Sequence, residues 1–357
     1  MDANRRQLVA TVLIALAGLS VGAPRCDAPV LTAQEAQGHA LYTQMCVVCH
    51  GEHGEGYKAD NAPAIGNRAY LAAASDRLLK GAIADGRRDT TMSAWSAPRG
   101  GPLTLAQIDA VVAYLRRWGR ADVARLDELP PMGDPIHGAQ LYAGECARCH
   151  GAHGTEGPSV HIGAPQLLAA VSNGFLREAI RNGRAPTTME PYLDKIGHGG
   201  VEDIVALLRT WQSGAAPLPT QPAARPAPLP LGPVPLHPKG PDPVGFRLQP
   251  LTTPADVIKA QLDRGARMAL LDARTPSDYT AEHIAGAVSV PFYDPAPYFD
   301  KLPKDSWLVC YCACPHAESG QLAQKLRSAG FNKVTVLDEG LGVWKNRKYG
   351  TAKGTTP

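Results

Sequence analysis

One feature constrains this chain more than any other: a segment that recurs about 100 residues further along. Residues 38–56 have the sequence GHALYTQMCVVCHGEHGEG, and residues 138–157 have the sequence GAQLYAGECARCHGAHGTEG. The match continues downstream, where GRRDTTMSAW at 86–95 recurs as GRAPTTMEPY at 183–192. Landmarks that recur at a nearly constant offset indicate two copies of one structural unit.

Both copies end in a sequence with helical periodicity. Apolar residues recur with the spacing of one helix face in each copy: Leu105, Ile108, Val112 and Leu115 in the first, and Val201, Ile204, Leu208 and Trp211 in the second. Thr104 and Gln107 form a capping box just before the first of these helices. The pattern predicts two mostly helical domains, at residues 34–120 and 134–213.

Each copy also contains a C-x-x-C-H motif. On one helical turn, two cysteines three residues apart reach both vinyl groups of a haem, and the adjacent histidine lies under the iron. A zinc site or a redox disulfide is the alternative, but zinc needs further ligands, and each copy offers only one nearby histidine, His53 or His153. We therefore predict two covalently bound haem c groups, attached at Cys46, Cys49 and His50 and at Cys146, Cys149 and His150.

A sixth iron ligand is needed in each copy. Met92 and Met189 are the only methionines between a motif and its closing helix, and both follow a Gly-Arg and a Thr-Thr pair. A thioether favours Fe(II) and raises the potential; the alternative role of such a methionine is to fill a core. The matched positions favour Met92 and Met189 over the rival histidines, which either lack matched positions or lie too close to the haem attachment: His39, His53, His153, His161 and His198.

These motifs resemble the class I cytochrome c family, including the Gly-x-x-Leu-Tyr helix before each haem motif and the methionine loop after it. The resemblance implies that each domain is an electron carrier with a histidine and a methionine on its iron. It also implies that the haem is attached outside the cytoplasm.

The N-terminus has the character of a targeting signal. Arg5 and Arg6 precede an apolar run at Leu8–Val21, which is short for a membrane span but typical of a secretory signal. Pro24 disfavours cleavage, so residues 1–25 are predicted to be either a signal peptide or an uncleaved membrane anchor. We expect a periplasmic or other extracytoplasmic protein, free or anchored to the inner membrane. The net charge of +3 argues against a nucleic-acid-binding protein.

A proline-rich segment separates the repeat from the rest of the chain. Eleven of the 27 residues from Pro217 to Pro243 are proline. Such a segment favours polyproline II and spans on the order of 80 Å when extended. We predict a linker at residues 214–247.

After the linker, strand-like and helical runs alternate. The expected strands are Met268–Leu271, Trp307–Tyr311 and Lys333–Leu337, and the expected helices are Pro254–Leu262 and Ser319–Ser328. This alternation predicts an α/β domain with a mainly parallel sheet covered on both faces. The predicted fold class is therefore multidomain, with two all-α domains and one α/β domain.

Residues 248–350 resemble a rhodanese-like domain. The resemblance rests on LLDARTPSDYTAEHIAGAVSVP at 270–291, WLVCYCACPHAESGQLAQKL at 307–326 and VLDEGLGVW at 336–344. It implies that Cys312 is the catalytic nucleophile, in a loop whose backbone N–H groups lower the thiol pKa.

The loop after Cys312 departs from the family pattern. It is one residue longer than in common sulfurtransferases, and Ala317-Glu318 stands where an arginine is usual, so thiosulfate is a doubtful substrate. Cys314 is a candidate to resolve a persulfide or to bridge to Cys312, and His316 is a candidate to polarise the thiolate. The remaining polar or sulfur-bearing residues are expected to be structural: Asp272, Arg274, His283 and Cys310.

These features predict a dihaem cytochrome that transfers electrons to redox partner proteins and couples this to a small sulfur-containing substrate at Cys312. The alternative is a plain electron carrier or respiratory subunit with a non-catalytic rhodanese-like module. A sulfurtransferase with regulatory haems is a third hypothesis. Whether the protein is an enzyme depends on which of these holds.

Overall fold

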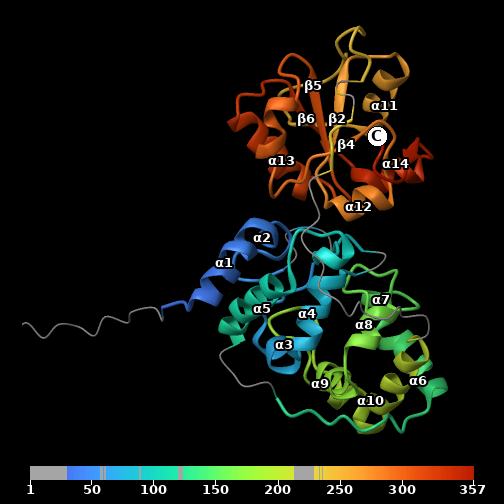
Figure 1. The fold of residues 1–357 in the computed structure, drawn as a ribbon. Coiled ribbons are helices and arrows are strands. Elements are labelled where there is room, and N and C mark those ends of the chain that lie inside the picture. Colours follow the sequence, from blue (N-terminus) through green and yellow to red (C-terminus); the bar gives the residue numbers. More distant parts are fainter. Residues whose placement is uncertain are drawn as a thin grey trace, which may run out of the picture.

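A computed structural model describes residues 30–56, 59, 62–87, 90–119, 124–212, 229–232, 234 and 236–357. Helices without a sheet form the N-terminal part, and a helix-covered sheet forms the C-terminal part (Figure 1). The predicted fold class is therefore confirmed. The expected signal or anchor at 1–25 lies outside the described residues, and among those described no helix has the length and apolarity to cross a membrane.

The first helical unit is built around a close crossing of its first and last helices, α1 (Ala33–Met45) and α5 (Leu105–Gly119). Gly38 permits this approach, because a Cβ there would overlap the carbonyl of Ala110. The capping box is present, with Gln107 N–H donating to Thr104 Oγ1 at 3.3 Å and Thr104 N–H to Gln107 Oε1 at 2.9 Å. The elements between them are α2 (Val47–His50), α3 (Arg68–Ala73), α4 (Asp76–Asp85) and the 3-10 turn η1 (Ala97–Arg99).

The second helical unit repeats this plan. Its first helix α6 (Pro135–Glu145) crosses α10 (Leu193–Thr210), and Gly138 approaches the carbonyl of Asp203 as Gly38 approaches Ala110. The short helices between them are α7 (Ala147–His150), α8 (Pro165–Ala170) and α9 (Asn173–Asn182). The glycine of the Gly-x-x-Leu-Tyr motif therefore has a packing role in both units.

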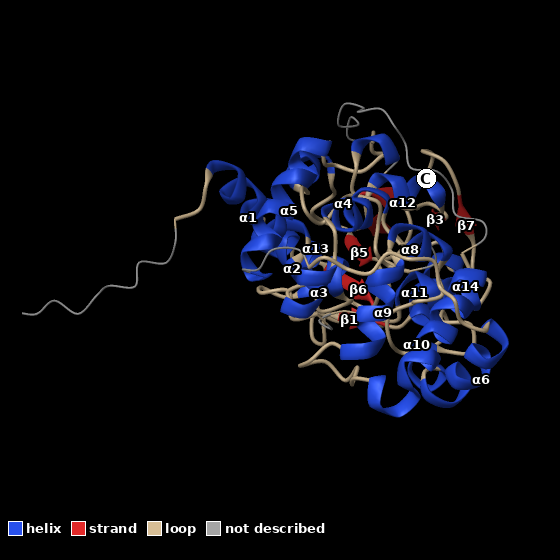
Figure 2. Ribbon diagram, turned by 90° about the horizontal axis from the view of Figure 1, so that it is seen from below, coloured by secondary structure: helices blue, strands red, loops and turns tan. Residues whose placement is uncertain are grey.

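The C-terminal unit contains a five-stranded parallel sheet in the order β1-β6-β5-β2-β4 (Figures 1 and 2). The strands are β1 (Thr252–Thr253), β2 (Met268–Asp272), β4 (Val288–Ser289), β5 (Trp307–Tyr311) and β6 (Val334–Leu337). The helices are α11 (Ala255–Asp263), α12 (Pro276–Ala281), α13 (Ala317–Ser328) and α14 (Gly340–Asn346), with the 3-10 turn η2 (Ala296–Lys301). A separate antiparallel pair joins β3 (His283–Ile284) to β7 (Thr351–Ala352).

Side chains of the central strands alternate between two cores. Leu308 and Cys310 of β5 belong to the cluster that contains Leu322 of α13, whereas Val309 and Tyr311 belong to the cluster with Trp344 of α14. Such alternation is the expected consequence of the two-residue strand period. Helices therefore cover both faces, as the sequence predicts.

The first helical unit lies against the carboxyl edge of this sheet. Ser93 Oγ donates to Asp278 Oδ2 at 2.5 Å, and Gln44 Nε2 donates to the carbonyl of Tyr293 at 2.8 Å. The Trp95 ring lies with its centroid 5.8 Å from that of Tyr293. Residues 278 and 293 follow β2 and β4 respectively, so both belong to the edge at which the parallel strands end.

Part of the expected linker is bonded to the α/β unit. Leu236 exchanges backbone hydrogen bonds with Met268, and Arg267 N–H donates to the carbonyl of Pro241. Asp242 pairs with the side chains of Arg267 and Lys333. Residues 236–242 are thus fixed along the sheet, whereas the expectation was an unpacked tether. The segment 213–228 lies outside the described residues.

Candidate haem sites and the Cys312 loop

The two C-x-x-C-H motifs have the same backbone. Cys46 ends α1 and starts α2, and His50 N–H donates to the Cys46 carbonyl at 2.9 Å. In the second copy the bond from His150 N–H to the Cys146 carbonyl is 3.0 Å. One turn of helix therefore carries both cysteines and the histidine in each copy, as attachment of a haem through two thioethers requires.

Both motif histidines are oriented by a backbone carbonyl. His50 Nδ1 lies 3.1 Å from the Pro63 oxygen, and His150 Nδ1 lies 2.9 Å from the Val160 oxygen. A carbonyl only accepts hydrogen bonds, so we assign the proton to Nδ1, which leaves the Nε2 lone pair free for a metal. Burial lowers the pKa of both imidazoles and favours this neutral form.

The tyrosine of the repeated motif holds the loop that follows each histidine. Tyr42 donates its hydroxyl to the Gly51 carbonyl at 2.7 Å, and Tyr142 donates to Gly151 at 3.0 Å. His53 and His153 are exposed, and their backbone N–H groups are bound by nearby glutamates. His53 and His153 therefore shape this loop. In the part of the chain that the structure describes, no group of three or more His, Cys, Asp or Glu side chains could hold a metal ion.

The methionine loops also match. Arg87 N–H donates to the Met92 carbonyl at 2.9 Å, and Arg184 N–H donates to the Met189 carbonyl at 2.8 Å. Each methionine N–H in turn donates to the hydroxyl of the first threonine of the Thr-Thr pair. Gly86 and Gly183 begin the loops with φ of 66° and 64°, which a residue with a side chain rarely adopts. Met92 and Met189 are thus half-buried at equivalent positions of two loops that share these hydrogen bonds.

Two arginines that the sequence argument did not assign lie beside these methionines. Arg184 is buried, and its Nη2 has no hydrogen-bond partner among the residues that the structure describes. Arg87, at the matched position, is half-buried, and burial lowers the pKa of its guanidinium. An anionic group fits a buried unpartnered guanidinium nitrogen, and the haem carboxylates are anions. The Gly-Arg pair repeated in both copies was the signal for these residues.

The two helical units meet at the Arg184 loop. Asn67 Nδ2 donates to the carbonyls of Arg184 and Ala185, at 3.2 and 2.7 Å. The Tyr70 and Phe175 rings make an edge contact with centroids 6.0 Å apart. The first helical unit therefore contacts both the second helical unit and the α/β unit.

Cys312 lies just beyond β5 and is fully buried. Its Sγ donates to the Cys314 carbonyl at 2.6 Å and lies 3.5 Å from Cys314 Sγ and 3.2 Å from Ser319 Oγ. Burial, and next the neighbouring Cys314 side chain, raise the pKa of the Cys312 thiol. The expectation of a lowered thiol pKa is therefore wrong for this conformation, because burial disfavours the charged thiolate.

Glu318 and His316 complete the loop. Glu318 is buried, and burial raises its pKa, with the proximity of Cys312 as a further cause. A neutral carboxyl does not repel anions, so the expectation that Glu318 disfavours anionic substrates stays a prediction. His316 adopts φ of 67°, and its Nε2 pairs with Asp338 at 2.7 Å on the exposed side of the loop. Its ring is directed to Asp338, not to the Cys312 thiol.

The residues expected to be structural have structural contacts. Arg274 makes a bidentate pair with Asp272, at 2.9 and 2.6 Å, and Tyr311 donates its hydroxyl to the same carboxylate. His283 stacks on Tyr279. Cys310 is buried within β5.

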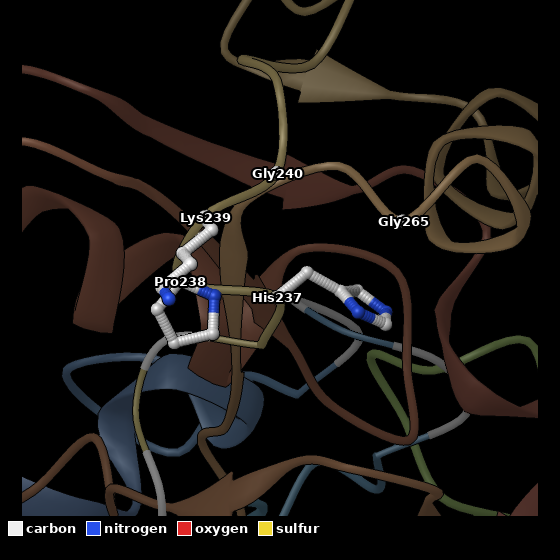
Figure 3. A pocket seen from close by; sticks show the side chains of 5 residues that line it. All are labelled: His237, Pro238, Lys239, Gly240 and Gly265. Carbon is white, nitrogen blue, oxygen red and sulfur yellow. The ribbon is translucent and has the colours of Figure 1, made fainter.

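A shallow pocket of about 430 Å³ lies at the other edge of the sheet (Figure 3). It is lined by His237, Pro238, Lys239, Gly240 and Gly265, next to the start of β2. Parallel strands run from this edge toward the Cys312 loop, so the pocket is remote from Cys312 and does not serve it.

Three parts of the chain match known families. Residues 254–347 match the rhodanese-like domain, residues 35–118 match cytochrome c, and residues 133–208 match cytochrome C oxidase, cbb3-type, subunit III. The chain therefore contains a cytochrome c domain, a cbb3-type cytochrome domain and a rhodanese-like domain. Cytochrome c domains imply covalently bound haem c.

Individual relatives are similar to separate parts of the chain. The cbb3-type cytochrome c oxidase subunit FixP of Bradyrhizobium sp. (strain ORS 278) is 28% identical over 225 residues, covering 55% of this chain and 73% of that protein. The probable adenylyltransferase/sulfurtransferase MoeZ of Mycobacterium tuberculosis is 31% identical over 89 residues, which cover 24% of this chain and only 22% of that protein. The solution structure of a rhodanese-like domain from Anabaena sp. is 33% identical, covers 29% of this chain and 79% of that chain, and has a TM-score of 0.28.

Proposed function

We propose that this protein is a periplasmic dihaem c-type cytochrome that couples electron transfer to sulfide or sulfane-sulfur chemistry at Cys312. Both cytochrome domains, at residues 34–120 and 134–213, are proposed to be of class I. Cys46, Cys49, His50 and Met92 would hold one haem, and Cys146, Cys149, His150 and Met189 would hold the other. Residues 1–25 would export the chain or anchor it, and redox proteins would exchange electrons with it.

One observation carries this proposal: the first cytochrome domain lies on the sheet edge that bears the Cys312 loop. Ser93 follows Met92 directly in the sequence, and its hydroxyl is bonded to Asp278 of the rhodanese-like domain. Helix α2, which contains His50, packs against α13, the helix that follows Cys312. A sulfur atom and a haem at these places would be neighbours across one interface.

The electron count suits this arrangement. Forming a persulfide from the Cys312 thiol and hydrogen sulfide makes one S–S bond and releases two protons and two electrons. Haem c supplies a one-electron acceptor in each cytochrome domain. The protein's own contribution is to orient His50 and His150 through the carbonyls of Pro63 and Val160 and to keep Cys312 away from bulk water.

The test is the rate at which sulfide reduces the haems. Oxidised holoprotein is mixed with sulfide in a stopped-flow spectrometer, and haem reduction is followed by absorbance. We expect Cys312→Ser to lose the fast phase, while the buried Cys310→Ala control keeps it. Equal rates for wild type and Cys312→Ser would refute the coupling.

A second candidate function is a respiratory electron carrier with a non-catalytic rhodanese-like module. The similarity to the FixP subunit supports it, as does the complete burial of Cys312. Cyanide releases sulfane sulfur as thiocyanate, so thiocyanate formation distinguishes the two candidates. Coupled sulfur chemistry predicts cyanide-labile sulfur on sulfur-treated wild type and none on Cys312→Ser. Absence of cyanide-labile sulfur from wild type and Cys312→Ser alike would favour the respiratory carrier.

A further inference from the structure

We propose that Cys312 and Cys314 form a buried dithiol–disulfide pair that exchanges two electrons with the haem groups of the same chain. The pair is a redox site in its own right and requires no external sulfur compound. The inference rests on the proposed function only for its electron acceptor.

The two sulfur atoms are in van der Waals contact. They lie 3.5 Å apart, and a disulfide of about 2.05 Å requires an approach of about 1.5 Å. Cys312 and Cys314 are 0% and 3% exposed. The Cys312 thiol also donates a hydrogen bond to the Cys314 carbonyl at 2.6 Å. Only Ala313 separates the two residues, so the loop needs no further closure.

The surroundings favour neutral sulfur over anionic sulfur. Burial raises the pKa of both the Cys312 thiol and the Glu318 carboxyl, and the proximity of Cys312 raises that of Glu318 further. A thiolate there would be a buried charge, whereas a dithiol and a disulfide carry no charge. The loop therefore suits a couple whose reduced and oxidised forms are both neutral.

The oxidation is balanced within one chain. Two S–H bonds break, one S–S bond forms, two protons leave to water, and two electrons leave the sulfurs. Ferric haem c in the two cytochrome domains accepts one electron in each. Helix α13, which follows the sulfur pair, packs against α2, which contains His50. The sulfur pair therefore lies at the sheet edge that the first cytochrome domain contacts.

The test counts electrons and maps thiols in the full-length holoprotein without any sulfur compound. Protein reduced with dithiothreitol and then dithionite is desalted under anaerobic conditions and titrated with ferricyanide. We expect four oxidising equivalents per wild-type chain and two per chain for Cys314→Ser or Cys312→Ser. Samples are then denatured in an alkylating agent and analysed by peptide mass spectrometry. Cleavage after Tyr311 separates Cys310 from the other two cysteines. In oxidised wild type we expect Cys310 to be alkylated and the peptide with Cys312 and Cys314 to be unlabelled and about 2 Da lighter than the dithiol.

Thiol mapping of the wild type tests the proposal even if a variant does not fold. Uptake of two oxidising equivalents per wild-type chain, with Cys312 and Cys314 both alkylated after oxidation, would overturn the proposal. So would a disulfide from Cys310 to either of them. Because no sulfide is present, these outcomes are independent of the stopped-flow result, and either hypothesis can fail alone.

Discussion

The hydrogen bond between Ser93 and Asp278 should hold the first cytochrome domain on the rhodanese-like domain. Ser93 is 7% exposed, and its hydroxyl donates to the half-buried Asp278 carboxylate at 2.5 Å. Ser93→Ala leaves that carboxylate without this donor, which costs about 1–3 kcal/mol. A loss of that size makes opening of the interface about 5- to 150-fold more favourable, because 1.4 kcal/mol corresponds to about a factor of ten.

Hydrogen exchange measures this local opening directly. The amides of Tyr279 and Phe292 are hydrogen-bonded within the segment that contacts the first cytochrome domain. We expect deuterium uptake by the peptides that span 276–293 to accelerate by the same 5- to 150-fold. Exchange in α11, remote from the interface, should not change.

Ser96→Ala is the matched control. Ser96 is also buried in the same loop, but its hydroxyl has no hydrogen-bond partner in the described part of the chain. Its removal breaks no bond, so exchange in 276–293 should stay at the wild-type rate. If Ser93→Ala and Ser96→Ala gave equal exchange, the reasoning would be refuted. Combining Ser93→Ala with Asp278→Ala should cost less than the sum of the single variants, because the two residues share one bond.

Three further predictions follow from packing, ligation and burial. Gly38→Ala should destabilise the first cytochrome domain by about 1–3 kcal/mol, because the added Cβ would overlap the Ala110 carbonyl. Gly81→Ala is the control: no atom of the described residues lies within 4 Å of its added Cβ, so it should be neutral or stabilising. Thermal unfolding of both variants checks this prediction. Met92→Ala and Met189→Ala should each lower the potential of one haem and leave the other unchanged, which a spectroscopic redox titration measures; two unchanged potentials would exclude methionine ligation. The pKa of the Cys312 thiol is raised in the folded state, so above pH ~8.5 the folded protein keeps the thiol proton whereas the unfolded chain loses it. The contribution of the thiol to the free energy of unfolding is therefore fully present below that pH and is lost as the pH rises further. Denaturant unfolding between pH 7 and 10 should therefore show a smaller alkaline loss of stability for Cys312→Ala than for wild type.

Local patterns were sufficient to predict most elements that position the sites. Strand Trp307–Tyr311 has the expected bounds, and the expected helix Pro254–Leu262 differs from α11 by one residue at each end. Periodicity and capping decide such elements within a few turns of chain. The matched methionine loops were likewise visible as a repeated Gly-Arg and Thr-Thr pair.

Long-range packing could not be predicted in the same way. The proline content of the linker gives no sign that Leu236 pairs with Met268, because that pairing depends on an exposed strand edge elsewhere in the chain. The raised pKa of the Cys312 thiol depends mainly on its complete burial, which results from packing between distant segments and is not specified by the local residue pattern. The partner of Ser93 is 185 residues away in the sequence.

The order of contacts gives the first cytochrome domain a central place in the proposed function. It meets the Cys312 edge of the sheet through Ser93 and Gln44, and it meets the second cytochrome domain through Asn67. Electrons that leave the sulfur pair would therefore reach the haem at His50 first and the haem at His150 second. The second domain would then be the one that faces a redox partner. Under the proposed function, a chain with one sulfur site would use two cytochrome domains because one haem would receive electrons at the sheet edge and the other would deliver them to that partner.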